Sequence, residues 1–220
     1  MKNTINTIKV LLVVVASSFC ALQARADSSV CDAAAGNLVS NCGFEVSSTF
    51  TSWTLSGNDV PGQEGNLYGV ESGLDPVSNI GPNSGNNQAY FGDLPSNPTT
   101  LSQNLVTTAG QTYTISFYLA QDTEGPGNAN NSVLVDFGGT QVDDLSNVGI
   151  QGYTFYSVTD VASSGSTNLA FVFGNEIGQF QIDDIEVVAT PEPGSWALLL
   201  TGVLLIGWMY RSKSGQALRS

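Results

Sequence analysis

The sequence predicts an all-β protein, an antiparallel β-sandwich flanked by a processed segment at each end. Short strands with alternating apolar and polar residues recur at regular spacing, and turns rich in glycine, asparagine and proline separate them. Between the two ends, no amphipathic run with the helical period exceeds about two turns. Many short strands joined by such turns are typical of two antiparallel sheets packed face to face.

The N-terminus has the features of a secretory signal peptide over residues 1–26. Lys2 and Lys9 precede an apolar run over residues 10–22, and alanines flank Arg25 just before the expected cleavage point. This order of basic, apolar and small residues predicts export and removal of the segment. The mature domain then covers residues 27–189, about 160 residues, which suits one domain with a sizeable core.

The charge of this domain excludes several functions. Its sequence contains no lysine, arginine or histidine, because all six basic residues lie in the two end segments. Such a domain repels nucleic acid and offers no histidine or lysine as a general base. The adjacent pairs Asp143-Asp144 and Asp183-Asp184 should point to opposite sides of their strands, which does not suit the facing carboxylates of a glycosidase. The switch of the apolar side between Ile182 and Ile185 also allows a small β-bulge at the second pair. The sequence therefore predicts a non-catalytic protein.

Cys31 and Cys42 are the two cysteines of the mature domain, since Cys20 leaves with the signal peptide. In an oxidising compartment such a pair is expected to form a disulfide that staples the N-terminal segment. A metal or redox site is the alternative, and it would lack the further thiol or imidazole that such sites use.

The clearest strand covers residues 112–120. Its apolar residues, which include Phe117 and Leu119, should face the core, while Tyr118 should face the other way. A strand should begin at Leu38 and Val39, and one or two short strands are expected within residues 56–87. Further strands are expected at residues 88–91, 101–105, 132–137, 140–142, 153–159, 168–173 and 179–188.

The start of the domain carries a recognisable pattern, formed by Asn41, Gly43, Phe44, Glu45 and Trp53. It resembles the opening of galactose-binding-like jelly rolls, which include several families of carbohydrate-binding modules. The resemblance implies a jelly-roll sandwich, with Trp53 in the core and a carbohydrate as the ligand class.

Glu45, Asp183 and Asp184 are the expected metal ligands. The first and last strands of a jelly roll can lie side by side, and calcium accepts carboxylate and carbonyl oxygens. The resemblance implies a structural Ca²⁺, because related modules hold one with the glutamate of this motif and an aspartate near the last strand. The alternative is an acidic rim whose carboxylates accept hydrogen bonds from turn amides.

Aromatic rings on the outside of the sandwich are candidates for stacking on sugars. Tyr118 and Tyr156 are the preferred candidates, because both are expected on the side of their strands opposite to the core. Most other rings suit the core better. The remaining aromatic candidates and the polar residues that could assist them are Trp53, Tyr68, Tyr90 and Tyr153, with Gln88, Asn104 and Gln179.

The C-terminal segment, residues 190–220, has three parts. Pro191-Glu192-Pro193 is followed by an apolar run over residues 196–210 and by a basic tail that begins at Arg211. The run would span roughly 22 Å as a helix, against about 30 Å of hydrocarbon core. The layout resembles the PEP-CTERM sorting signal, which consists of the motif, a transmembrane helix and the tail. An ordinary C-terminal anchor is the alternative.

The PEP-CTERM resemblance implies an exosortase as processing partner. The chain would be anchored in the inner membrane only transiently and would then reach the cell surface or extracellular matrix. PEP-CTERM systems accompany exopolysaccharide production, so a non-catalytic surface protein that associates with polysaccharide is expected. The alternative is a structural or adhesive biofilm protein without a specific glycan ligand, whose acidic surface is bridged by divalent cations.

Overall fold

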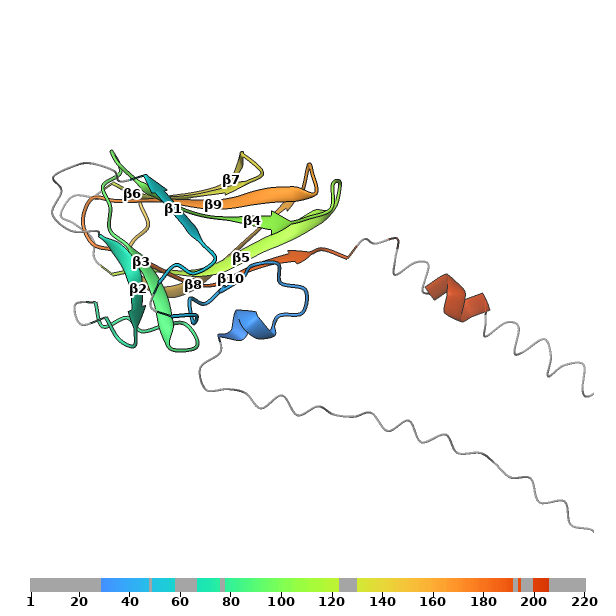
Figure 1. Ribbon diagram of the computed structural model, residues 1–220, viewed down its shortest axis with the longest axis horizontal. Coiled ribbons are helices and arrows are strands. Elements are labelled where there is room, and N and C mark those ends of the chain that lie inside the picture. The colour runs from blue at the N-terminus through green and yellow to red at the C-terminus, as the bar shows by residue number, and fades with distance from the viewer. Residues whose placement is uncertain are drawn as a thin grey trace, which may run out of the picture.

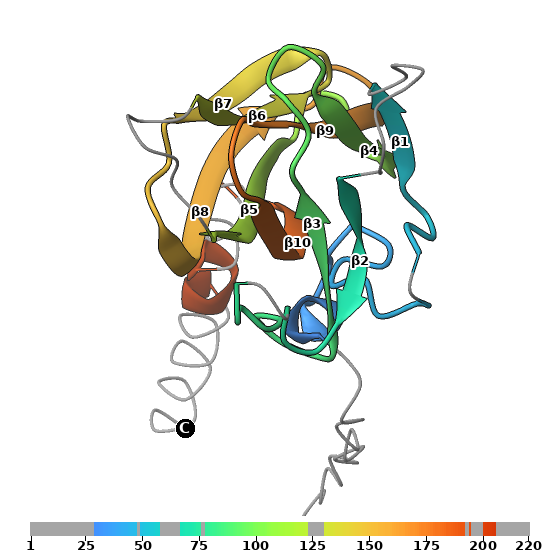
Figure 2. The ribbon, with the colours of Figure 1, turned by 90° about the vertical axis from the view of Figure 1, so that its left-hand side faces the viewer.

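The computed structural model describes residues 29–47, 49–57, 67–75, 78–122, 130–191, 194 and 200–205. They include ten strands and one short 3₁₀ helix, η1, and residues 200–205 near the C-terminus are helical. The strands pair in two five-stranded antiparallel sheets (Figures 1 and 2). The elements are η1 Val30–Ala33, β1 Thr54–Gly57, β2 Tyr68–Ser72, β3 Asn87–Phe91, β4 Thr99–Val106, β5 Thr112–Gln121, β6 Asn131–Phe137, β7 Thr140–Ser146, β8 Gln151–Val161, β9 Ser166–Asn175 and β10 Phe180–Ala189.

The two sheets form the layers of a sandwich. The first sheet has the order β1-β4-β9-β6-β7, and the second has the order β2-β3-β10-β5-β8. Figure 2 shows them as two layers, with η1 and the loop between β2 and β3 on the side of the second sheet that faces away from the first sheet. The expected all-β sandwich is confirmed.

The core lies between the sheets and is rich in aromatic side chains. Phe91 of β3 stacks on Phe173 of β9 with ring centroids 4.0 Å apart, and Phe117 of β5 meets Phe171 of β9 edge to face at 5.1 Å. All four rings are fully buried. Each such side chain contributes about 1.5–3 kcal/mol to the free energy of unfolding, so these contacts hold the layers together.

The N-terminal segment lies beside β10 without forming a regular strand. The amide of Leu38 donates to the carbonyl of Val187, and the amide of Ile185 donates to the carbonyl of Cys42, both at 3.0 Å. The strand expected at Leu38 and Val39 is therefore wrong, although the two ends of the domain do lie side by side. The predicted disulfide between Cys31 and Cys42 is confirmed.

A β-bulge interrupts β10. Its pairing with β5 shifts register between Asp183 and Glu186, and Asp184 has a φ of 50°. The expectation that Asp183 and Asp184 point to opposite faces is wrong, because the bulge turns both carboxylates toward the same loop, residues 83–84.

The expected signal peptide, residues 1–26, lies wholly outside the described residues, and the C-terminal segment 190–220 lies mostly outside them. Glu192 and Pro193 of the sorting motif are among the residues outside. Thr190, just beyond β10, donates its amide to the carbonyl of Thr112, and Pro191 follows it. Within the described part of the chain, no helix has the length and apolar character needed to cross a membrane.

Candidate functional site

The candidate site is the outer face of the second sheet, meaning the side that points away from the first sheet. Ile182 of β10 faces the core and pairs with Ala89 and Leu119, so the preceding residue, Gln181, points outward. Residues paired directly across strands share a face. The outer face therefore carries Gly69, Glu71, Gln88, Tyr90, Tyr118, Ala120, Tyr153, Phe155, Gln181 and Asp183.

A hydrogen bond crosses the middle of this face. The hydroxyl of Tyr153 on β8 donates to Oε1 of Gln88 on β3 at 2.8 Å. Two strands, β5 and β10, separate β8 from β3, and neighbouring strands lie about 4.8 Å apart. The bond must therefore pass above β5 and β10, where the small Ala120 leaves room. Burial, followed by the nearby Asp183 and Glu71 charges, raises the pKa of Tyr153, so its hydroxyl stays a proton donor.

Gln88 extends this bridge to a carboxylate. Its Nε2 donates to Oε1 of Glu71 at 2.6 Å and to the carbonyl of Ile80 at 3.0 Å. Burial raises the pKa of Glu71 to about 7; the bond from Gln88 opposes that shift, and the neighbouring Asp75 adds to it. Glu71, Gln88 and Tyr153 thus form a fixed polar chain across all five strands of the sheet.

Gln181 lies within this polar surface and has no partner. Its side chain is fully buried, and neither Nε2 nor Oε1 has a hydrogen-bond partner among the described residues. An unmade hydrogen bond of this kind costs about 1–3 kcal/mol per group. Native proteins keep few such groups, and those that persist call for a ligand, a water or a functional role.

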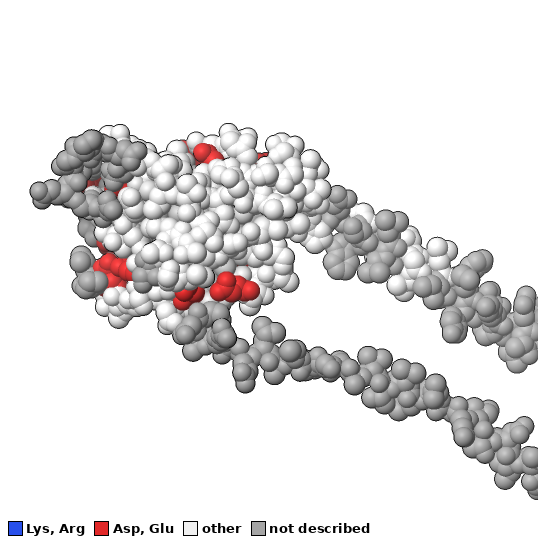
Figure 3. All heavy atoms as spheres, viewed as in Figure 1, with Lys and Arg blue, Asp and Glu red and all other residues white. Residues whose placement is uncertain are grey.

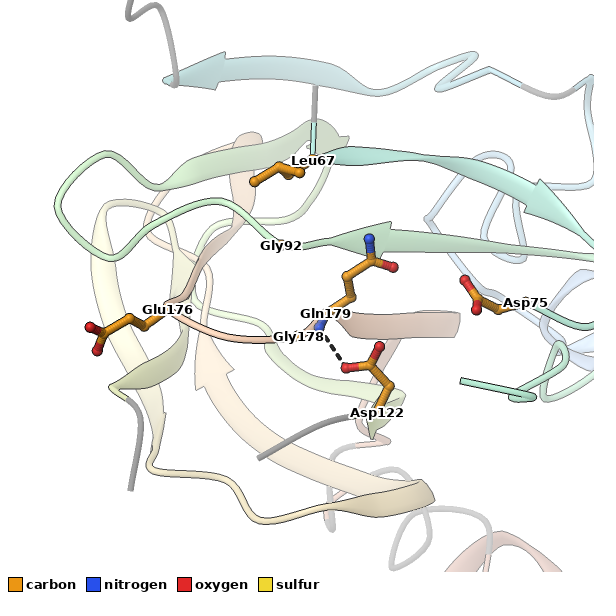
Figure 4. A pocket seen from close by; sticks show the side chains of 7 residues that line it. All are labelled: Leu67, Asp75, Gly92, Asp122, Glu176, Gly178 and Gln179. Atoms are coloured by element: carbon orange, nitrogen blue, oxygen red, sulfur yellow. Dashed lines mark hydrogen bonds between the residues drawn. The ribbon is translucent and has the colours of Figure 1, made fainter. Parts of the chain in front are cut away.

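A pocket of about 340 Å³ opens at one end of the outer face, where β2 and β10 begin and β3 and β5 end (Figure 4). Asp122 follows β5, and its Oδ1 accepts the amide of Gln179 at 2.6 Å. Gln179 precedes Gln181 by two residues, so the two amides share a side of the chain. The lining residues are Leu67, Asp75, Gly92, Asp122, Glu176, Gly178 and Gln179.

The two preferred aromatic candidates lie in different places. Tyr118 is on the outer face as expected, and its ring lies 5.2 Å from that of the exposed Phe155. Tyr156 was expected on the side opposite to the core, and that placement is wrong. Its ring stacks on buried Phe117 at 5.6 Å and packs against the core.

The other aromatic candidates also divide between core and outer face. Trp53 is buried and donates its indole N–H to the carbonyl of Asn41 at 3.1 Å. Tyr68 packs against the core beside Phe91. Tyr90 lies on the outer face across Gly69, where an added Cβ would come within 2.6 Å of the Tyr90 hydroxyl.

Asp183 and Asp184 are buried and hold the loop at residues 83–84. Oδ2 of Asp183 accepts the amides of Asn83 at 2.8 Å and Ser84 at 3.2 Å. Oδ2 of Asp184 accepts the side-chain amide of Asn83 at 2.7 Å, and its Oδ1 accepts the hydroxyl of Ser84 at 2.8 Å. Burial and the Asp184 charge raise the pKa of Asp183 to about 8, although the backbone amides oppose the shift.

Glu45 holds the next part of the same loop. Its Oε1 accepts the amides of Asn86 at 2.8 Å and Asn87 at 3.0 Å. Gly85 has a φ of 67°, and a Cβ there would lie 2.1 Å from this oxygen. The three expected ligands thus meet one loop, residues 83–87. In the described ranges the one group of three clustered ligand residues is Cys31, Asp32 and Cys42, two of which form the disulfide.

The surface of the domain is acidic without compensating bases. Figure 3 shows Asp and Glu side chains in separate patches on the face in view and no basic side chain among the described residues there. The sequence has none between residues 27 and 189, whereas the whole chain has a formal net charge of −13. A buried carboxylate here cannot be neutralised by a basic side chain of its own domain.

Comparison with solved structures identifies the fold. The carbohydrate-binding module TmCBM61, solved with β-1,4-galactotriose, matches with a TM-score of 0.52 at 21% identity, over 70% of this chain and 99% of the module. A putative sugar-binding protein from Bacteroides thetaiotaomicron matches with a TM-score of 0.46 at 11% identity, over 70% of this chain and 100% of that protein. The xylan-binding CBM22-1 domain of Paenibacillus barcinonensis Xyn10C matches with a TM-score of 0.44 at 14% identity, over 66% of this chain and 90% of that domain.

The fold is that of carbohydrate-binding-module-like β-sandwiches. No protein-family model matches the chain, and no curated protein matches it either.

Sequence reasoning had named Gln88, Tyr90, Tyr153 and Gln179 only as secondary candidates, and it missed Gln181, Asp75 and Asp122. Gln181 did leave a signal, because it is an amide between apolar residues of a buried strand. The two aspartates lie in loops and gave none.

Proposed function

We propose that this protein is an exported, non-catalytic protein that binds extracellular polysaccharide through the outer face of the second sheet. The observation that carries the proposal is the pocket of about 340 Å³ at the end of this face, which the amide side chain of Gln179 lines together with carboxylates. An amide offers an acceptor and two donors, which complement the hydroxyls of a sugar. Tyr118 and Phe155 add apolar ring surface on the same face.

The carboxylates of this face support a binding role rather than catalysis. Glu71 and Asp75 interact directly through their side chains. Glycosidases instead hold two carboxyl groups about 5 Å or more apart, on either side of the scissile bond. The domain also has no histidine, lysine or arginine to serve as a general base or an oxyanion donor.

Replacing Gln179 with leucine should abolish glycan binding without harming the fold. Gln179 is half-buried, and leucine has a similar volume and keeps the backbone amide that bonds to Asp122, so the free energy of unfolding should change by less than about 1 kcal/mol. Affinity for the bound glycan should fall by at least about tenfold, the loss expected when hydrogen bonds worth about 1.4 kcal/mol or more disappear. A glycan array followed by titration calorimetry measures the first effect, and thermal melting measures the second.

Asn104→Ala is the matched control, because Asn104 is an exposed amide on β4 of the first sheet. It should leave glycan affinity unchanged. Wild-type affinity in Gln179→Leu would show that this pocket is not the binding site.

We further propose that an exosortase-type enzyme processes the C-terminal segment. Support comes from the sequence: Pro191-Glu192-Pro193, the short apolar run and the basic tail occur in the PEP-CTERM order. Replacing the three motif residues with alanine should give a protein that is exported but retained uncut in the inner membrane. Mass spectrometry of the mature C-terminus tests this in the native host. A wild-type tail that is intact through Ser220 would instead indicate an ordinary anchor.

A structural Ca²⁺ belongs to the same proposal. The donor chemistry fits, because Asp183, Asp184 and Glu45 supply the carboxylate oxygens that calcium prefers and all meet the loop at residues 83–87, although the three carboxylates do not form one cluster among the described residues. Two of these carboxylates are buried in a domain without basic side chains, so a bound cation would offset their charge. When bound, the ion would neutralise the aspartates and hold the loop at residues 83–87 against β10.

The acidic surface favours one alternative function, that of a structural matrix protein whose molecules are bridged by divalent cations. That protein would bind no glycan on the array and would self-associate when calcium is added. The glycan measurement therefore separates the two functions.

A further inference from the structure

We infer that the pocket at the end of the outer face selects uncharged glycans and rejects acidic ones, with Asp75 and Asp122 as the residues that set this specificity. The inference rests on the proposed polysaccharide-binding function. It concerns which polymer of a matrix this protein can hold, since matrices contain both neutral and uronic-acid polymers.

The charge of the pocket is the first argument. Asp75, Asp122 and Glu176 line it, and Glu71 interacts electrostatically with both aspartates from the neighbouring part of the face. No basic residue occurs between residues 27 and 189 to offset them. Like charges brought together in a partly desolvated site repel strongly, so an anionic sugar would meet a large penalty.

Hydrogen-bonding capacity is the second argument. Ionised carboxylates only accept, and the hydroxyls of neutral sugars can donate to them. The bond from the Gln179 amide fixes the orientation of the Asp122 carboxylate. Figure 4 shows that Asp122 and Gln179 come from adjacent strand ends and that Asp75 comes from the loop after β2.

The test compares neutral and acidic oligosaccharides of equal length on the purified, secreted protein. The neutral probes are the hexasaccharides of β-1,4-linked glucose, galactose, xylose and mannose. The acidic probes are the hexamers of glucuronic, galacturonic and mannuronic acid. Affinities are measured at one ionic strength, once in chelator and once in millimolar calcium. We expect at least one neutral probe to bind, and every acidic probe to bind at least about 100-fold more weakly in both conditions.

Asp122→Asn is the decisive variant, because asparagine can still accept the Gln179 amide while the charge is gone. It should lower the affinity for the neutral probes by about tenfold and reduce the difference in affinity between the neutral and the acidic probes. Asp143→Asn on β7 of the first sheet is the control and should change neither affinity.

Three outcomes would count against the inference in different ways. An acidic probe that binds as tightly as a neutral one in chelator would overturn the selectivity and leave the polysaccharide-binding function standing. An acidic probe that binds tightly only with calcium would replace hydroxyl recognition by a cation bridge. If no probe of either class binds, the proposed function itself is contradicted.

Discussion

Millimolar calcium should raise the melting temperature of the mature domain by about 5–10 °C relative to a sodium control of equal ionic strength. An ion that binds only the folded state at 100 times its Kd stabilises that state by about 2.7 kcal/mol. In a domain of this size each kcal/mol shifts melting by about 2–4 °C. Chelator should reverse the gain, because the two buried carboxylates then lose their counter-ion.

Three single substitutions test which residues cause the calcium-specific rise in melting temperature. Asp183→Asn and Glu45→Gln should each remove most of the calcium-specific shift, since each takes away a carboxylate that meets the loop at residues 83–87. Asp143→Asn, on β7 of the first sheet, should retain the full shift. Equal shifts with calcium and sodium at matched ionic strength would mean that these acidic residues bind no ion.

Loss of the disulfide should lower the free energy of unfolding by about 3 kcal/mol, which corresponds to a fall in melting temperature of about 6–12 °C. Cys31 and Cys42 are 11 residues apart, so the bridge restricts a short loop of the unfolded chain. In the folded state it holds the segment that pairs with β10 through Leu38 and Cys42. The double variant Cys31→Ser, Cys42→Ser should show the fall by calorimetry.

Alkylating reagent provides the control for the disulfide. Without reductant it should leave the mass and the melting temperature of the wild type unchanged, and after reduction it should label two thiols. Labelling of both cysteines without reductant would contradict the bridge in the secreted protein.

The Tyr156 correction shows where pattern reading fails. Alternation along β8 separates Tyr153 and Phe155 from Tyr156 and Val158, but both sets contain large apolar or aromatic side chains. A period of two identifies the residues that share a face and does not say which face is buried. Only packing against Phe117 shows that Tyr156 belongs to the inner side.

The bulge in β10 is a second place where strand alternation gave a wrong prediction, here for two of the expected metal ligands. Strict alternation separates Asp183 from Asp184, whereas the left-handed conformation at Asp184 brings both carboxylates to one loop. Glu45 reaches that loop from the other end of the domain. The sequence therefore named the acidic residues, and tertiary structure decided what they contact.

The sequence by itself determined the properties that depend on local pattern and composition. These are the all-β class, most of the strands, the core side of residues 112–120, the disulfide and the complete lack of basic side chains between residues 27 and 189. Each property follows from neighbours within one strand or from a count of residues, and none of them depends on the order of the strands in the sheets.

Tertiary structure alone decided the candidate site, because its parts come from strands and loops far apart in the chain. The bond from Tyr153 to Gln88 joins residues 65 positions apart, and the pocket brings Asp75 near Asp122 and Gln179. Such neighbours depend on the order β2-β3-β10-β5-β8, which strand periodicity does not encode. The unpartnered state of Gln181 likewise appears only once β3 and β5 have closed on either side of it.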